Sequence, residues 1–444
     1  MSETSVERSR QLHERARRTA PGGVHGEGQF YPPNPLYFET GSGKWLTDID
    51  GNRYLDYHGG FGTAILGYQN AEVTDAVAQA TLERGTFLGL PHEGGVDLSE
   101  RLCALIPSAE VVALSGGGGS DSLYVATRLA RSLTGRKKLL KIEGGYHGWH
   151  SDLAVGVRPP LDALPEVGLP VAVSGGSLPE VTDQVVVVEA NDTAALHDAF
   201  ERHGSELALA VVEPILFSAG CFRIQPDFMA ALREGCDTSG ALLLFDEVMS
   251  GFRSGLAGAG SQSGVMPDLS VFGKAMANGY IISALTGRRA VMDHLSPVGP
   301  AFFSGTFNGH PLSVAAALKT LEIIERDNVA DRLSELTERM VSGVNAEISR
   351  LGVNAVCQGT GSVWSLYFLT RSVRRYRDIG GDNPVLANQL TREFFQHLRE
   401  SGIYAQQRMF VRCFLSAEHR EEDIDRTIDV VADFLNSKRA VLTD

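Results

Sequence analysis

Six short apolar runs, separated by segments long enough for helices, constrain the fold of this 444-residue chain most strongly. Each run has four to six residues and is mostly apolar, with many β-branched side chains. A strand in a parallel sheet has such a continuous apolar sequence because helices cover both faces of the sheet. The runs therefore predict a large α/β domain with a mostly parallel sheet between helices. They lie at residues 111–114, 138–142, 185–188, 207–212, 241–245 and 269–272.

The pattern differs on both sides of this region. Near the N-terminus, strand-like pieces at 36–39 and 44–48 and a turn at 50–52 lead into a further strand at 54–57. After Pro311 we expect a long helical stretch from 312 to about 350, helices at 387–400 and 422–435, and strands near 363–368 and 410–414. The chain then divides into an N-terminal segment that joins the small domain, a large domain and a smaller α+β domain, at residues 1–60, 61–310 and 311–444.

Composition excludes several classes of protein. With 40 Lys and Arg against 54 Asp and Glu, the formal charge is −14, which argues against a nucleic-acid surface. No stretch approaches the roughly 20 apolar residues that span a bilayer, and the N-terminus does not resemble a secretory signal, so a cytoplasmic protein is expected. The five cysteines are far apart and odd in number, which favours reduced core residues over a disulfide framework or a zinc site.

A glycine run follows the first strand of the predicted sheet, where ligands bind in open α/β sheets. Residues 116–119 are all glycine, and Ser120 precedes a helical pattern. Such a turn lets successive N–H groups converge at a helix N-terminus, which favours a phosphate or a carboxylate. The alternative is a strand-to-helix turn without a ligand. The segment is neither a P-loop nor a dinucleotide-binding fingerprint.

Asp246 directly follows the apolar run at 241–245. A carboxylate at this position can be a metal ligand, a general base, the partner of a cationic ring nitrogen, or only a helix cap. No His, Asp or Glu cluster with metal-ligand spacing accompanies it, so no metal site is expected.

Lys274 and Tyr146 follow two other strands of the same predicted sheet. Lys274 lies among small apolar residues, where an unpaired ammonium is costly. A lowered pKa would make this amine a nucleophile toward a carbonyl, whereas the alternative is a lysine that reaches solvent. Tyr146 is flanked by glycines and could lie flat on a planar ligand or form an ordinary aromatic turn.

Together these features meet the needs of one cofactor. Pyridoxal 5′-phosphate needs a lysine that binds it as an imine, an anion cradle, a carboxylate that keeps its ring nitrogen protonated, and apolar or aromatic contacts for its ring faces.

Motifs along nearly the whole chain carry a family resemblance. They include Pro21-Gly22-Gly23, Gly145-Tyr146-His147-Gly148, Val212-Glu213-Pro214, Phe245-Asp246-Glu247-Val248, Phe272-Gly273-Lys274 and Ser304-Gly305-Thr306-Phe307. In these motifs the chain resembles the class III aminotransferases, which are fold type I pyridoxal-phosphate enzymes. The similar branch contains glutamate-1-semialdehyde aminomutase and the β-amino-acid aminotransferases. The resemblance implies a large domain with a mostly parallel seven-stranded sheet between helices, and a smaller α+β domain from the N- and C-terminal segments.

The resemblance also implies roles around the cofactor ring. Lys274 would be the Schiff-base lysine and the base that moves the proton. Asp246 would be the partner of the ring nitrogen, with His147 in the same cofactor pocket. Tyr146 would stack on one face of the ring, and Val248 would pack on the other.

Further implied contacts lie at the edge of the ring and at the phosphate. Glu213 matches a family position close to the imine and the ring hydroxyl. Gly118, Gly119 and Ser120 would hold the phosphate. Thr306 would reach the phosphate of the neighbouring subunit, which makes a homodimer the minimal functional unit.

Two departures from the family pattern affect these expectations. Gly118 replaces a usual serine, so we expect somewhat weaker phosphate binding, because a lost hydrogen bond to a charged group costs ~1.5–3 kcal/mol. Gln29 stands where the aminomutases have an arginine, and residues 155–173 replace their Gly-Ser-Gly-rich loop. Both replacements weigh against an aminomutase.

Candidate substrate contacts follow from the same comparison. Arg408 resembles an arginine of the β-amino-acid enzymes and could bind a substrate carboxylate, as could Arg253. Gln29 and Tyr31 are further candidates. Arg412 is expected to face solvent or a salt bridge.

The leading hypothesis is an aminotransferase that moves an amino group between an amino acid or amine, including β-amino and ω-amino compounds, and an oxo acid through Lys274. The alternative is an isomerase, either an aminomutase or an amino-acid racemase or epimerase, with a decarboxylase as a lesser possibility. A regulatory protein without activity is disfavoured by the joint presence of Lys274, Asp246 and Tyr146. Partners are then small molecules and a second copy of the chain.

Overall fold

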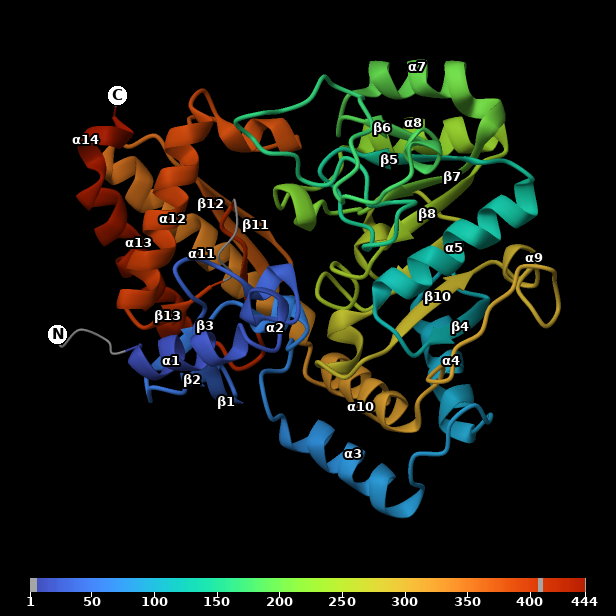
Figure 1. The fold of residues 1–444 in the computed structure, drawn as a ribbon, viewed down its shortest axis with the longest axis horizontal. Helices are drawn as coiled ribbons and strands as arrows, with labels where there is room; N and C mark the ends of the chain where they lie inside the picture. Colours follow the sequence, from blue (N-terminus) through green and yellow to red (C-terminus); the bar gives the residue numbers. More distant parts are fainter. Residues whose placement is uncertain (1–5, 406–409, 444) are drawn as a thin grey trace.

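A computed structural model describes residues 6–405 and 410–443. Figure 1 shows a large sheet with its helices on one side of the molecule and the C-terminal helices on the other. The N-terminal strands lie beside the C-terminal helices, although the two segments are far apart in the sequence. No helix in the described part of the chain is long and apolar enough to cross a membrane.

The large sheet has seven strands in the order β4-β10-β9-β8-β7-β5-β6. Six of them correspond to the six predicted runs, which confirms the mostly parallel α/β fold class. The resemblance implied a seventh strand but its position was not predicted; this strand, β10, pairs antiparallel with both β4 and β9. Its sequence Ser-Ala-Leu-Thr-Gly lacks a continuous apolar run. The strands are β4 (Val111–Ser115), β5 (Lys138–Ile142), β6 (Val185–Val188), β7 (Leu207–Val212), β8 (Leu242–Asp246), β9 (Leu269–Phe272) and β10 (Ser283–Gly287).

Helices cover both faces of this sheet, as its apolar strands require. Helix α5 (Gly119–Thr134) packs on one face, and helices α7 (Thr193–His203) and α8 (Pro226–Ser239) pack on the other. Because side chains alternate along a strand, Leu244 contributes to the first core and Phe245 to the second. A shift of the register by one residue would move side chains from one core to the other, so packing in both cores fixes the register of each strand.

The predicted helical stretch from 312 to about 350 is confirmed, and it consists of two helices. Helix α10 (Pro311–Arg326) packs on α3 (Ala71–Glu83) and α4 (Glu93–Leu105). The chain breaks at Asn328, whose φ of +47° is left-handed, a conformation that asparagine tolerates better than most residues. Helix α11 (Val329–Leu351) then begins.

The second part of the molecule contains two small sheets. A three-stranded sheet combines β11 (Val356–Thr360), β12 (Val363–Tyr367) and β14 (Cys413–Phe414). A four-stranded sheet combines β1 (Phe38–Ser42), β2 (Trp45–Asp48), β3 (Arg53–Asp56) and β13 (Ile403–Tyr404). Since β13 pairs with β3, the N-terminal segment joins the C-terminal part in one sheet, as predicted. The domain bounds at residues 60 and 310 stay predictions.

The remaining elements connect these parts. The C-terminal part also contains α12 (Pro384–Glu400), α13 (Glu421–Ser437) and α14 (Arg439–Leu442). Further α-helices are α1 (Glu7–Ala16), α2 (Gly59–Gly62), α6 (Pro179–Thr182) and α9 (Arg289–Met292). Short 3-10 helices lie at Pro21–Gly23, Glu27–Gln29, Gly204–Glu206, Phe217–Ala219, Ala259–Gln262, Lys274–Ala277 and Tyr376–Gly380. All five cysteines are free, and four of them are buried.

Candidate active site

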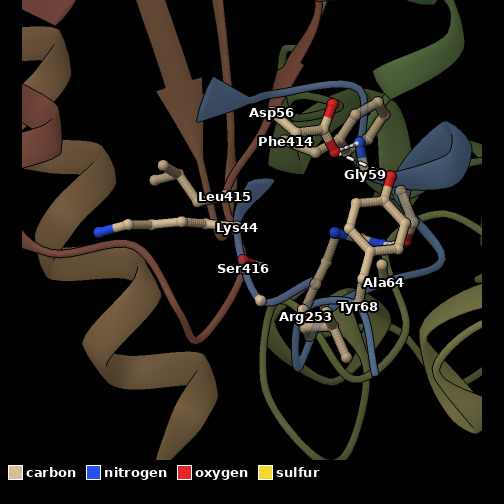
Figure 2. A pocket seen from close by; sticks show the side chains of 13 residues that line it. Lys44, Asp56, Gly59, Ala64, Tyr68, Arg253, Phe414, Leu415 and Ser416 are labelled. Carbon is tan, nitrogen blue, oxygen red and sulfur yellow. Dashed lines mark hydrogen bonds between the residues drawn. The ribbon is translucent and has the colours of Figure 1, made fainter. Parts of the chain in front are cut away.

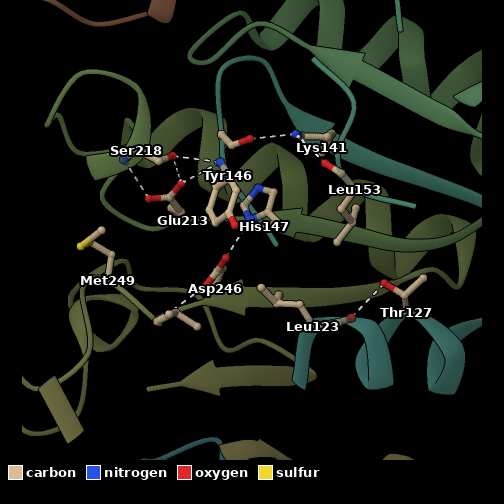
Figure 3. Close-up of polar contacts among 12 residues, drawn as sticks. Leu123, Thr127, Lys141, Tyr146, His147, Leu153, Glu213, Ser218, Asp246 and Met249 are labelled. Carbon is tan, nitrogen blue, oxygen red and sulfur yellow. Dashed lines mark hydrogen bonds and ion pairs between the residues drawn. The ribbon is translucent and has the colours of Figure 1, made fainter. Parts of the chain in front are cut away.

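The candidate site lies where the central strands of the large sheet end. Val212 at the end of β7 pairs with Phe245 of β8, so Glu213 and Asp246 follow at the same level. Asp246 in turn pairs with Val271 of β9, three residues before Lys274. Figure 3 shows Glu213 and Asp246 directed toward Tyr146 and His147, which follow β5. The sheet therefore brings the predicted residues of four separate segments together.

Asp246 is a buried carboxylate held by two donors. His147 Nδ1 lies 2.8 Å from Asp246 Oδ2, and the Val248 N–H donates to Asp246 Oδ1 at 3.0 Å. Both the His147 and the Asp246 side chains are almost completely buried. These contacts orient a negative charge at the end of β8, where it can stabilise a cationic nitrogen of a ligand.

Tyr146 lies on a tight turn that requires glycine. Gly144 and Gly148 have φ values of +79° and +99°, which other residues rarely adopt. The Tyr146 N–H donates to Ser218 Oγ at 3.0 Å, while its side chain stays 37% exposed. The Arg158 guanidinium lies 5.5 Å from the centroid of the Tyr146 ring. A partly exposed ring on a fixed backbone can provide a flat contact for a ligand.

Glu213 is buried beside this turn and is held by Ser218. The Ser218 hydroxyl and its N–H, the latter at 3.2 Å, both donate to the Glu213 carboxylate. The Tyr146 N–H also lies 3.4 Å from Glu213 Oε1. Burial raises the pKa of Glu213 above its ordinary value. Ser218 therefore connects a buried acid to the backbone of Tyr146.

Lys274 presents an amine without an anionic partner. Its backbone has a left-handed φ of +47°, and Nζ contacts Met249 Sδ at 3.8 Å. Within residues 6–405 and 410–443, no carboxylate forms an ion pair with this amine. Burial, and next the charge of Arg412, lower the pKa of Lys274 to about 8. At pH 7 about a tenth of this amine is then neutral, far more than for an ordinary lysine, and the neutral amine is a nucleophile.

The glycine run forms a tight turn at the start of α5. A Cβ atom at Gly119 would lie 2.4 Å from Val248 Cγ2, and one at Gly116 would lie 2.2 Å from the Phe307 carbonyl. At Gly118, by contrast, a Cβ atom would meet nothing within 4 Å. Gly118 caps the helix without a side-chain hydrogen bond, and the Asp121 N–H donates to the Gly118 carbonyl at 3.0 Å. The N–H groups of Gly119 and Ser120 have no acceptor among the described residues. An anion can bind there.

Close backbone contacts join this turn to the other site segments. A Cβ atom at Gly148 would lie 3.1 Å from Ser120, and one at Gly273 would lie 3.8 Å from Val248. The turn after β5, the start of α5 and the segment of Lys274 therefore form one site. Thr306 is exposed, and Asn308 of the same segment accepts a hydrogen bond from the Gly116 N–H at 3.0 Å.

The arginines divide into three cases. Arg408 lies outside the described residues. The Arg253 guanidinium is completely buried and donates to Ser362 Oγ at 2.8 Å and to the Met249 and Gly62 carbonyls. A substrate carboxylate would have to displace these bonds.

The expectation that Arg412 faces solvent or a salt bridge is wrong as to solvent. Arg412 is only 6% exposed and donates to the Phe217 carbonyl at 3.1 Å. Its guanidinium lies 5.9 and 5.6 Å from the rings of Phe410 and Phe414. These aromatic contacts keep a cation close enough to Lys274 to lower the pKa of its amine.

Gln29 and Tyr31 have described contacts elsewhere. Gln29 is exposed and accepts a hydrogen bond from the His25 N–H at 3.0 Å. Tyr31 is buried in a small cluster with Leu36 and Tyr54. Its hydroxyl accepts from the Leu36 N–H at 2.7 Å. Their substrate roles stay predictions without support from these contacts.

A small cavity beside Arg253 is too small for a substrate. Asp56, Tyr68 and Phe414 line it together with Arg253 (Figure 2). Its volume of about 10 Å³ holds at most one water molecule. Asp56 is already satisfied by the His58 and Gly59 N–H groups and the Tyr68 hydroxyl, at 2.8, 2.9 and 2.8 Å. The described residues also contain no group of three side chains that could hold a metal ion.

Several site residues were missed in the sequence. Ser218 lies in none of the family motifs, and Met249 ends the family motif at residues 245–249 but was given no role. Arg412 was misplaced because its burial depends on aromatic residues beside it in the fold. Lys141 could have been found from the sequence, because a lysine inside the apolar run of β5 indicates a buried cation.

Comparisons with known proteins agree with this geometry. The family profile described as aminotransferase class III matches residues 29–435. Glutamate-1-semialdehyde 2,1-aminomutase of Nitrosospira multiformis is 36% identical and aligns over 95% of this chain and 98% of its own length. A solved β-phenylalanine aminotransferase from Variovorax paradoxus has a TM-score of 0.87 and 30% identity, covering 98% of this chain and 95% of its own. A solved transaminase with PLP bound has a TM-score of 0.89 and 28% identity, covering 100% of both chains.

The lowered pKa of Lys274 generates a prediction for chemical labelling. Because only the neutral, uncombined amine reacts, acetylation of Lys274 in protein freed of pyridoxal phosphate should reach half of its maximal rate near pH 8, the value to which burial lowers its pKa. An ordinary lysine would require about pH 10.4. Peptide mass spectrometry after timed exposure to acetic anhydride measures this rate. In Arg412→Met the midpoint should move upward, because a neighbouring positive charge is removed. A midpoint above pH 10 in the unsubstituted protein would contradict the assigned environment.

Proposed function

The chain belongs to the class III aminotransferase family and uses pyridoxal 5′-phosphate (PLP), and on this premise we propose that it is an aminotransferase. Its substrates are an amino acid or amine, including β-amino and ω-amino compounds, and an oxo acid. The observation that carries the proposal is the Lys274 amine, which has a lowered pKa, no anionic partner among the described residues, and the oriented carboxylate of Asp246 in the same site.

The site residues fit PLP. The open space at Gly118 and the free N–H groups at the start of α5 suit its phosphate. Asp246 suits the ring nitrogen, and the exposed ring of Tyr146 suits one face of the cofactor. Val248, beside Gly119, suits the opposite face. Lys274 provides the amine for the aldehyde.

When bound, PLP accepts the electrons of a bond that breaks at the substrate's amine-bearing carbon. Lys274 would hold the cofactor through its aldehyde and, once the amino donor has taken its place there, would move a proton at that carbon. Asp246 holds its negative charge against the ring nitrogen, and His147 keeps the carboxylate in place through Nδ1. Glu213 and Ser218 fix the backbone of Tyr146 and hence its ring.

Phosphate binding relies on backbone donors. Gly118 contributes no hydroxyl, so the N–H groups of Gly119 and its neighbours and the Ser120 hydroxyl carry the contact. We therefore retain the expectation of weaker phosphate binding than a serine at position 118 would provide.

An isomerase is the second candidate, because the relative from Nitrosospira multiformis is named as an aminomutase. Gln29 and the segment 155–173 weigh against it. Hydrogen bonds join the two ends of this segment, since the Gly156 N–H donates to the Val171 carbonyl at 2.7 Å and the Val173 N–H donates to the Ala154 carbonyl at 3.0 Å. Racemase, epimerase and decarboxylase outcomes stay further alternatives.

A half-reaction separates these outcomes. With an amino donor and no acceptor, an aminotransferase should release about one equivalent of oxo product per Lys274, because the amino group stays on the enzyme. An isomerase would return the amine with no net oxo product. Quenched single-turnover assays by chromatography measure the product. Lys274→Ala serves as the control and should release none. Repeated turnover without an acceptor, or no oxo product from any donor tested, would contradict the proposal.

Arg412 is the arginine that we propose for the substrate carboxylate. It is the arginine whose charge acts most strongly on the Lys274 amine, and its aromatic contacts hold it in place. Arg253 is committed to its own hydrogen bonds. Arg408 remains the second candidate from the resemblance.

Substitution should distinguish the two arginines. In Arg412→Met, kcat/KM for carboxylate donors should fall by about 10- to 100-fold, because a hydrogen bond to a charged group is worth ~1.5–3 kcal/mol. Amine donors without a carboxylate should lose little, and PLP binding should stay within about twofold. Arg408→Met is the matched variant. If it alone loses activity toward carboxylates, the role belongs to Arg408, and unchanged kinetics in Arg412→Met would reject the proposal for Arg412.

A homodimer is the proposed functional unit, with Thr306 contributed to the partner's phosphate. Thr306 is exposed in a segment that also exposes Phe302 and Phe307, at 64% and 55%. Exposed apolar side chains of this size favour a protein interface. Sedimentation equilibrium should give about twice the chain mass of 47.8 kDa. A particle of the chain mass at micromolar concentration would contradict the dimer.

A further inference from the structure

A buried lysine lies behind the turn of Tyr146. Lys141 of β5 is completely buried, and its Nζ donates to three backbone carbonyls. The acceptors are Gly145 at 2.8 Å, Leu153 at 3.2 Å and Val155 at 2.7 Å. Figure 3 shows Lys141 on the side of the turn opposite to Asp246.

These three contacts use the full donor capacity of an ammonium group. A charged lysine has three N–H donors, and each of them has a carbonyl acceptor here. A neutral amine has only two, so one buried carbonyl would lose its partner. Burial lowers the pKa of Lys141 to about 7, while the charges of Glu213 and Asp246 act in the opposite direction. The hydrogen-bond geometry fits the charged form.

The carbonyl of Gly145 belongs to the same peptide group as the N–H of Tyr146. Lys141 holds the carbonyl end at 2.8 Å, and Ser218 Oγ holds the N–H end at 3.0 Å. A peptide group is planar, so contacts at both ends restrict its rotation. The next side chains along the chain are Tyr146 and His147.

The other two carbonyls lie beyond this turn. Leu153 and Val155 precede Arg158, whose guanidinium lies 5.5 Å from the centroid of the Tyr146 ring. Lys141 thus joins the start of the turn to the segment that returns over Tyr146. Loss of the amine would release both attachments at once.

We propose that Lys141 is a positioning residue for the PLP site. It fixes the Gly145–Tyr146 peptide, and through it the Tyr146 ring and the contact of His147 with Asp246. The inference rests on the proposed roles of Tyr146 and Asp246 toward PLP.

The chain offers a matched control at the other end of the same strand. Arg136 precedes β5 and donates to the carbonyls of Gly204, Leu207 and Ser239, at 3.4, 3.1 and 2.7 Å. Arg136→Met therefore also removes a cation that holds three carbonyls. None of these three residues belongs to the candidate site, so a purely structural loss should have the same effect in both variants.

The experiment compares Lys141→Met with Arg136→Met in the full chain. The measurements are the thermal midpoint, the PLP dissociation constant by equilibrium dialysis, and the pH at which the absorbance of bound PLP changes. We expect both variants to lower the thermal midpoint. Only Lys141→Met should weaken PLP binding by about tenfold or more and shift the absorbance transition by about half a pH unit or more. Lys141→Arg, which keeps a cation with several donors, should recover part of both effects.

Other results overturn the inference. If PLP affinity and the absorbance transition are unchanged in Lys141→Met, or change equally in Arg136→Met, Lys141 is not a positioning residue. If neither Lys141 variant yields folded protein, its role is structural and the proposal fails. Failure of the aminotransferase proposal would be distinguishable from failure of this inference. If the unsubstituted protein binds PLP but transfers no amino group, PLP binding can still be compared between the Lys141 and Arg136 variants.

Discussion

The pairing register of β7, β8 and β9 is the constraint on which the candidate site depends. It sets Val212 opposite Phe245 and Asp246 opposite Val271, so that Glu213, Asp246 and Lys274 emerge at one edge of the sheet. A slip of one residue would turn Asp246 to the other face, because side chains alternate along a strand. Such a slip would also exchange the two apolar cores on either side of the sheet. The position of a few polar groups is therefore enforced by the packing of many apolar ones.

Much of this arrangement could be predicted from the sequence. The central strands are continuous apolar runs, and Asp246 and Lys274 directly follow two of them, so both their location and their chemistry were accessible. Strand β10 was not, because its pairing on both sides compensates for a sequence that lacks a continuous apolar run. The break before α11 depends on the conformation of Asn328, and the burial of Arg412 depends on surrounding rings. Such features arise from tertiary contacts, and short sequence windows do not contain them.

The site places buried charges of both signs close together. The charges of Asp246 and Glu213 raise the pKa values of Lys274 and Lys141 against the effect of burial, and the charge of Arg412 lowers the pKa of Lys274. Most of the charged side chains that make up the net charge of −14 are not buried, so salt screens their effect on the site. The buried charges of the site are screened far less, so they act more strongly on the local pKa values. Asp246, with its two donors, keeps a fixed orientation, whereas Lys274, whose amine contacts only the Met249 thioether within residues 6–405 and 410–443, is free to react. The group that is held in a fixed orientation, Asp246, is thus not the group that reacts, Lys274.

The parallel pairing of β3 with β13 has a consequence for how the chain is made. Ile403 pairs with Leu55, and the Tyr57 N–H donates to the Tyr404 carbonyl at 2.7 Å. All seven strands of the large sheet have been synthesised by residue 287, long before β13 leaves the ribosome. The edge of β3 that pairs with β13 therefore stays unpaired until β13 has been synthesised. An unpaired strand edge can pair with other chains. The sheet that contains the first strands to be translated is therefore among the last to acquire all its strands. Until β13 is synthesised, the nascent chain exposes the unpaired backbone N–H and C=O groups of β3.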